Sequence, residues 1–421
     1  MELKLTDKRL LIISLLLLNI GMLFGQKIEG RLAYSNVFQI LSILVLIPIT
    51  IKVFQKRDYV FVTLNICMMA IGALWISNVY ETEIQMAHII FFLVMIIYIS
   101  TLFSLINKYK IQQAILAVYK YITIPICLYF CLFAVEELFI QKSGYISLGF
   151  DDKSHAAILC AFFAFMSLVL FTSSIRFVLS LMFMVLSLLT ISRFSLIFLA
   201  LYIPVFLYNF VTSSKKLLEE NRKSKYVTLY IQFLLFLGTT VFASLFVIQN
   251  QSMFGVFTRA EAGGDNGSTT GHMLLIQYGL QIKFQNLMNL IFGITPGEYS
   301  LVATHAGIDL SKFAMLDPTG YQAMLLGLMP MHSSHLSFFV EFPLLFFITY
   351  LFLLVTIFVG LVKKKRIIEL FFFVGFVIAT SFYSSHNELF FYSIFVYLLT
   401  ISALPSKANA ILNFESKKGV A

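Results

Sequence analysis

Charged side chains are scarce in this chain. Only 12% of its 421 residues are Asp, Glu, Lys or Arg, whereas 59% are hydrophobic. Soluble domains are roughly half apolar and about one quarter charged, so this composition excludes an ordinary soluble globular protein. Together with a mean hydropathy of +0.90, it predicts an all-α polytopic membrane protein.

Cysteine and acidic metal-binding motifs are scarce too. The four cysteines, Cys67, Cys127, Cys131 and Cys160, all fall inside apolar stretches. They form no disulfide framework, and no His or acidic partner completes a metal set, so they are interpreted as packing residues. Since an Asp-x-Asp cluster is also lacking, we expect neither a metal requirement nor another cofactor.

Long apolar segments dominate what is present. Crossing about 30 Å of hydrocarbon takes roughly 20 helical residues. This criterion predicts about 12 transmembrane helices, at 10–25, 33–51, 59–77, 86–106, 121–140, 155–174, 177–192, 194–211, 227–248, 336–361, 367–383 and 389–404. The first lacks a small-x-small cleavage site, so we expect a retained anchor rather than a signal peptide.

The basic residues are distributed unevenly between the predicted loops. Of the 30 Lys and Arg residues, 22 fall on the side of the termini and eight on the other. Cytoplasmic loops of membrane proteins are rich in Lys and Arg, which predicts that both termini are cytoplasmic. The same bias explains the net charge of +9 without a nucleic-acid partner.

One long polar interval separates two groups of spans. The predicted organisation is 1–248 with transmembrane helices 1–9, a large periplasmic or extracellular loop at 249–335, and 336–421 with helices 10–12 and a short cytoplasmic tail. Within the loop, 273–292 mixes apolar and amide residues, which predicts one or two interfacial helices. Gly and Pro residues between 296 and 327 predict a folded loop with short helical pieces.

Three cationic or imidazole side chains on this outer side are candidate anion ligands. Arg193 stands between two apolar spans with almost no turn, so its guanidinium is held at the membrane edge and suits phosphate oxygens. An ordinary loop arginine is the alternative. Arg259 and His272 flank the Gly-rich segment 262–271, and solvent exposure is the alternative for both.

The candidates for acid–base chemistry are His332, His335 and Glu341, at the entrance of the span that follows the loop. If one helix included both histidines, they would share a face at i, i+3. Glu341 would then face away from His332, so either His332 precedes the helix or the two do not touch. Which histidine would act as a base is open, and a structural role is the alternative for each.

Weaker polar groups stand at other predicted helix ends on the same side. They are Asp151 to His155 before the sixth span, Ser385 to Glu388 before the twelfth, and Glu136 and Glu137 at the end of the fifth. Helix ends are normally polar, so each group alone predicts little. Together they favour a site on the outer face.

Four stretches give the chain a resemblance to the superfamily of O-antigen polymerases and O-antigen ligases. Ser192-Arg193 resembles the family's Ser-Arg at the outer end of a span, and 266–272 resembles Gly-Ser-x-x-Gly-Arg at the head of the loop helix. The segment 290–297 resembles its Leu-Phe-Gly-x-Gly, and 330–343 its Pro-His-Asn-x-x-Leu…Val-Glu-x-Gly. The chain departs from the family at His272, Ser333 and Pro343, where the family has Arg, Asn and Gly.

The resemblance implies a GT-C-like glycosyltransferase of the bacterial inner membrane, most like an O-antigen polymerase of lipopolysaccharide biosynthesis. Its substrate would be an oligosaccharide linked to undecaprenyl pyrophosphate. Membrane lipids and the pathway's chain-length regulator and flippase would be its partners. Position 272 departs from the pattern, which weakens a phosphate-binding role there because a neutral imidazole is a poorer anion ligand.

The candidate residues fit this chemistry. A lipid pyrophosphate is a good leaving group, so catalysis needs cations that stabilise developing charge, such as Arg193 and Arg259. The acceptor hydroxyl gains from a base such as His332. Glu341 could orient His332 or bind an acceptor hydroxyl. The alternatives are an O-antigen ligase that transfers glycan to lipid A core, and a lipid-linked oligosaccharide flippase. Against the flippase stand the unequal halves of the chain and its polar groups gathered at one face.

Overall fold

The computed structural model describes residues 3–24, 27–29, 32–84, 86–150, 152–172, 174–219 and 267–405. These residues are predominantly helical, with one short antiparallel hairpin, so the all-α prediction is confirmed in outline. Two sequence predictions, the span at 227–248 and the site residue Arg259, lie outside the described residues.

The first part of the chain forms long helices that contact one another along the bundle. Its elements are α1 (Leu5–Gly21), β1 (Lys27–Glu29), β2 (Leu32–Ala33), α2 (Tyr34–Val53), α3 (Lys56–Tyr80) and α4 (Met86–Lys108). They continue with α5 (Gln112–Val135), the π-helical turn η1 (Glu136–Ile140), α6 (Lys153–Leu170), α7 (Ile175–Leu189) and α8 (Arg193–Glu219).

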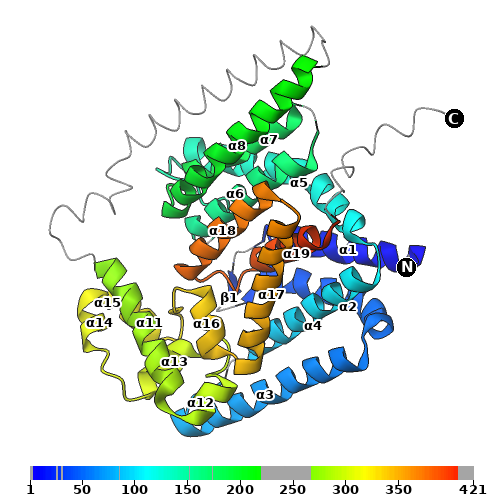
Figure 1. Cartoon of the computed structure of the whole chain (residues 1–421). Coiled ribbons are helices and arrows are strands. Elements are labelled where there is room, and N and C mark those ends of the chain that lie inside the picture. The colour runs from blue at the N-terminus through cyan, green and yellow to red at the C-terminus, as the bar shows by residue number, and fades with distance from the viewer. Residues whose placement is uncertain are drawn as a thin grey trace.

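Five helices follow, which we call the cap. They are α11 (Gly267–Gln285), α12 (Leu287–Phe292), α13 (Tyr299–His305), α14 (Ser311–Leu316) and α15 (Pro318–Leu325). The cap gathers on one side of the bundle, at the left in Figure 1, whereas α1 lies at the opposite side. Its own core contains Leu275, Tyr278, Ile282, Tyr299 and Phe313. Short helices therefore occupy the interval where the sequence predicts them.

The predicted span 336–361 is wrong as a single helix. The structure divides it into α16 (Ser334–Glu341) and α17 (Leu344–Lys363). Pro343 has no backbone N–H and disfavours helical geometry in the residue before it, and Phe342 is accordingly extended. The break leaves Glu341 at the end of a short helix rather than within a long one. The chain then continues with α18 (Ile367–Ser381) and α19 (Leu389–Ala403).

Seven of the described helices are long and apolar enough to cross a membrane. Three shorter apolar helices, α7, α18 and α19, pack among them. Large apolar side chains are exposed on the outer faces, for example Leu74 at 66%, Leu132 at 71% and Phe352 at 63%. So much exposed apolar surface suits acyl chains rather than water. The chain is a helical membrane protein, and seven spans of the predicted twelve are supported by length and composition.

Helices α6 and α19 are buried along almost their whole length. Helix α6 packs against α5, α7, α8 and α18, and α19 packs against α1, α4, α5 and α17. Because helices this apolar are enclosed on every side, their amino ends are fixed in position. Both amino ends open on the same polar cavity, which is described next.

Candidate functional site

A polar cavity of about 270 Å³ lies between the helix bundle and the cap. Its lining includes three histidines and three carboxylates: His88, Asp152, His155, Glu341, His386 and Glu388. They come from the starts of α4, α6 and α19, from the segment before α19, and from the end of α16. Ionisable groups this concentrated inside a membrane protein make the cavity a candidate functional site.

The amino end of α6 supplies two of these residues. Asp152 is its N-cap and accepts a hydrogen bond from the Ser154 backbone N–H at 2.7 Å. Burial would raise the pKa of Asp152, but hydrogen bonds from Tyr383 and Ser154 and the nearby His155 together lower it. This carboxylate is therefore ionised at neutral pH.

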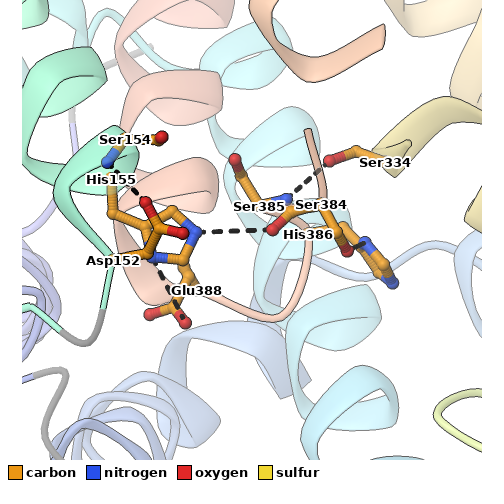
Figure 2. Close-up of polar contacts among 8 residues, drawn as sticks. All are labelled: Asp152, Ser154, His155, Ser334, Ser384, Ser385, His386 and Glu388. Atoms are coloured by element: carbon orange, nitrogen blue, oxygen red, sulfur yellow. Dashed lines mark hydrogen bonds and ion pairs between the residues drawn. The ribbon is translucent and has the colours of Figure 1, made fainter. Parts of the chain in front are cut away.

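His155 connects α6 to the segment before α19, as Figure 2 shows. Its Nε2 donates to the Ser384 carbonyl at 3.3 Å, and its Nδ1 lies 3.8 Å from Glu388 Oε1. The ring also packs edge-on against Tyr383, with centroids 5.0 Å apart. With Nε2 acting as donor, Nδ1 is the ring nitrogen that faces the Glu388 carboxylate.

The segment before α19 is fastened to the start of α16. Ser334 donates from both its backbone N–H and its Oγ to the Tyr383 carbonyl. The Ser385 N–H donates to Ser334 Oγ at 2.8 Å, as Figure 2 shows. Buried backbone groups are thereby paired across two elements. The wall formed by residues 383–388 is consequently fixed to the helix that carries Glu341.

His386 belongs to this wall and is 1% exposed. Its Nδ1 lies 3.2 Å from Ser384 Oγ, whereas Nε2 has no hydrogen-bond partner in the described part of the chain. Burial, together with His88 and His335, lowers the pKa of His386 to about 3. The ring is thus a neutral imidazole with one nitrogen available to a ligand.

Arg193 opens α8 directly after the short turn that ends α7, as the sequence predicts. The preceding Ile191 has φ +52, a left-handed conformation that is costly for a β-branched residue. Thr190 Oγ1 supports the turn by accepting from the Ser192 N–H at 3.3 Å. The guanidinium is exposed and lowers the pKa of His272 after the larger effect of burial. Arg193 and His272 are therefore neighbours.

His332 lies in the loop before α16, so it shares no helix with His335. It has φ +54, and Ser333 is the N-cap of α16, accepting from the Leu336 N–H. The His332 ring stacks on His272, with centroids 4.0 Å apart. Burial, and then His272, lowers the pKa of His332 to about 4, against opposing effects of Asp152 and Asp317. Its Nδ1 has no hydrogen-bond partner among the described residues.

His335 is directed away from this group. Its Nδ1 accepts from the Tyr350 hydroxyl at 2.6 Å, and its Nε2 donates to the Val377 carbonyl at 3.2 Å. Both ring nitrogens therefore join α16 to α17 and α18. This geometry gives His335 a packing role, and it does not place the ring beside His332.

Glu341 faces the polar cavity from the end of α16. Its Oε2 accepts from the Gly297 backbone N–H at 2.7 Å. Gly297 has φ +81, and a Cβ there would come within 2.1 Å of His88 Nδ1. Glycine is thus required both for the backbone conformation and for the contact with His88.

The structure brings together Arg193, His272 and His332, and places Glu341 in the adjoining cavity. It separates His335 from them. The sequence prediction does not include His88 or Tyr383, and it treats Asp152, His155, His386 and Glu388 as weak signals at polar helix ends. The sequence signal for these residues is that they stand at the ends of predicted helices on the outer side of the membrane.

No protein-family model matches this sequence, and no curated protein matches it either. The geometry described above is therefore what identifies these residues as a candidate site.

Proposed function

We propose that this chain is a polysaccharide polymerase of the bacterial inner membrane. It would transfer a growing glycan from undecaprenyl pyrophosphate to the terminal sugar of a new lipid-linked repeat unit. The observation that supports this proposal is the adjacency of Arg193, His272 and His332 to a cavity containing Asp152, Glu341 and Glu388. Both termini would be cytoplasmic and the cap would lie outside.

The reaction exchanges one C–O bond for another. The acceptor hydroxyl oxygen attacks the anomeric carbon of the donor, and the bond from that carbon to the lipid diphosphate breaks. The diphosphate leaves with the electron pair, and the hydroxyl proton passes to a base. Such a site needs a cation near the leaving group, a proton acceptor near the hydroxyl, and polar groups that orient sugars.

Each requirement has a candidate among the described residues. Arg193 would stabilise the departing diphosphate, because guanidinium groups bind phosphate oxygens in a forked geometry. His332 would take the proton, since it is neutral at physiological pH and its Nδ1 has no hydrogen-bond partner among the described residues. General-base catalysis contributes about 10²–10⁴-fold. With its pKa at about 4, His332 would contribute at the lower end of that range.

The carboxylates would bind the acceptor glycan. Asp152, Glu341 and Glu388 are hydrogen-bond acceptors suited to sugar hydroxyls. They also repel a diphosphate, so the leaving group would lie on the Arg193 side. This division would place the departing diphosphate and the acceptor glycan on either side of His332 and Tyr383, whose ring centroids lie 6.3 Å apart.

The test is elongation by purified protein in lipid nanodiscs supplied with lipid-linked repeat units. A polymerase lengthens the glycan and releases undecaprenyl pyrophosphate without other proteins. A flippase would move the lipid without lengthening its glycan, and that result would overturn the proposal. A deletion strain distinguishes a polymerase from a ligase. Loss of a polymerase leaves single repeats on lipid A core, whereas loss of a ligase leaves none.

A further inference from the structure

Tyr383 belongs to the segment between α18 and α19, where it lines the polar cavity and is half-buried. Its backbone is fixed to the start of α16. The Tyr383 carbonyl accepts hydrogen bonds from the Ser334 backbone N–H at 3.3 Å and from Ser334 Oγ at 3.0 Å. The Tyr383 side chain is therefore presented to the cavity from a point that two elements hold in place.

The Tyr383 ring contacts residues from three separate parts of the chain. It meets the His155 ring of α6 with centroids 5.0 Å apart and 72° between the planes, and the Phe194 ring of α8 at 5.7 Å and 61°. The His332 ring, in the loop before α16, lies 6.3 Å away. Distances and angles of this kind are typical of stabilising aromatic pairs. The ring is therefore held in contact with α6, α8 and the loop that contains the proposed base.

The Tyr383 hydroxyl has a partner at the start of α6. It donates a hydrogen bond to the carboxylate of Asp152, which also accepts from the Ser154 backbone N–H at 2.7 Å. Because the two donors belong to different elements, together they fix the rotation of the carboxylate as well as its position. An ionised carboxylate has about four lone-pair sites. About two of them are left for a ligand in the cavity that Asp152 lines.

We infer that Tyr383 is a positioning residue, which holds Asp152 in the orientation in which this carboxylate accepts a hydroxyl of the acceptor sugar. The inference rests on the proposed function, in which the carboxylates bind the acceptor glycan. The Tyr383 hydroxyl carries a single proton and directs it to Asp152, so this tyrosine is not itself a proton donor to the substrate. Packing does not require the hydroxyl, because a phenylalanine ring would make the same ring contacts.

The same hydrogen bond favours the ionised form of Asp152. Burial raises the pKa of Asp152, and the bond from Tyr383 is the largest of the effects that lower it. The described titratable groups that interact with this carboxylate are Tyr383, His155 on its own helix, and His332 in the loop before α16. Without the Tyr383 hydroxyl the pKa of Asp152 should rise. Since an ionised carboxylate is the stronger hydrogen-bond acceptor, sugar binding should then weaken at a higher pH.

The experiment measures binding of the acceptor rather than transfer. A lipid-linked repeat unit with a fluorescent sugar is titrated at pH 7 into protein in nanodiscs, and wild type is compared with Tyr383→Phe, Asp152→Asn and the double variant. Phenylalanine retains the ring, and asparagine retains a good N-cap for α6, so each substitution changes little besides the hydroxyl or the charge. The matched control is Tyr350→Phe, which removes a buried hydroxyl that donates to His335 at 2.6 Å.

We expect Tyr383→Phe to raise the dissociation constant at least about fivefold and Asp152→Asn about tenfold. The double variant should lie within about twofold of Asp152→Asn, because the tyrosine acts through the carboxylate and the two losses are not additive. Tyr350→Phe should stay within about twofold of wild type. When the titration is repeated from pH 8 to pH 5, binding should weaken at a higher pH in Tyr383→Phe than in wild type.

Normal binding by Tyr383→Phe would overturn the inference, as would losses that multiply in the double variant. A pH profile of Tyr383→Phe that matches wild type would overturn it too, since a purely structural role leaves that profile in place. The polymerase proposal is tested separately by elongation. If binding follows the expected pattern but wild-type protein does not elongate glycan, the role of Tyr383 stands and the polymerase proposal falls.

Discussion

The His332 ring lies nearly parallel to the His272 ring, with centroids 4.0 Å apart and 14° between their planes. His272 belongs to the first cap helix, whereas His332 stands in the loop that leads from the cap to α16. The stack therefore fixes the cap to the entrance of the membrane helices. It also buries both rings enough that each is neutral at physiological pH.

Removing this stack should destabilise the cap. An aromatic pair contributes about 0.5–1.5 kcal/mol beyond burial, so His272→Ala should lower the free energy of unfolding by about 1 kcal/mol. His272→Phe retains a ring and should lose less than half of that. Thermal unfolding in detergent measures both. Equal losses in the two variants would show that the nitrogens of His272, rather than its ring, stabilise the cap.

Acid should destabilise the protein through His386. Its folded pKa is about 3, below about 6.5 in an unfolded chain, so the unfolded state binds the proton first. The contribution is constant above about pH 7 and decreases as pH falls from about 6.5 toward 3, by at most about 1.4 kcal/mol per pH unit. His386→Asn should reduce this slope in thermal unfolding between pH 4 and pH 8.

The control for that slope is His305→Asn, because His305 is exposed on the cap and bonded to the Leu301 carbonyl. It should leave the slope as in wild type. A slope that His386→Asn does not reduce would contradict a buried neutral imidazole at this position.

Lys283 should destabilise the fold at neutral pH. This α11 side chain is fully buried, donates to the Phe342 carbonyl at 3.2 Å and lies 5.3 Å from the Phe339 ring centre. Burial lowers its pKa to about 7, so stability decreases as pH falls from about 10.5 toward 7. Lys283→Met should therefore raise the free energy of unfolding at pH 7 by at least about 1 kcal/mol.

That gain should shrink as pH rises to about 10, where the unfolded lysine also begins to lose its proton. The comparison is Lys312→Met on α14, whose side chain is exposed. Thermal unfolding at pH 7, 8.5 and 10 gives the three points. A Lys283→Met variant that is less stable than wild type at pH 7 would show that the bond to Phe342 outweighs the burial of charge.

Glu341 should matter to stability as well as to sugar binding. Glu341→Ala leaves the Gly297 N–H without the carboxylate that accepts from it at 2.7 Å, a loss of about 1 kcal/mol for a partly buried donor. Glu341→Gln keeps an acceptor oxygen and should lose less. In the nanodisc assay, however, both variants should bind the lipid-linked repeat more weakly than wild type. Normal binding by Glu341→Gln would limit Glu341 to a structural role.

The membrane fold could be predicted from the sequence because apolar length alone identifies a spanning helix. Apolar length alone predicts one span across α16 and α17, whereas Pro343 marks the break between them in the sequence. The sequence also identifies Arg193 and His332 as candidate site residues, each from its own local context. Their placement depends on packing between segments distant in the chain. Nothing in the local sequence shows that His272 stacks on His332.

The polar cavity could not be predicted from the local sequence either. His88, His155 and His386 stand at separate helix ends, and each looks like an ordinary polar cap in sequence. Their convergence follows from the burial of α6 and α19, which fixes the amino ends of both helices at one place. The assignment of His335 illustrates the opposite case. Its proximity in sequence to His332 suggested a shared site, whereas its hydrogen bonds join α16 to α17 and α18.

The most direct test of the central claim compares Arg193→Gln and His332→Asn with wild type in the nanodisc elongation assay, with His305→Asn as the control. We expect the control to elongate glycan at the wild-type rate. Each of the other two variants should be slower by about 10²-fold at equal amounts of folded protein. Long polymer made by both variants at the wild-type rate would contradict the account.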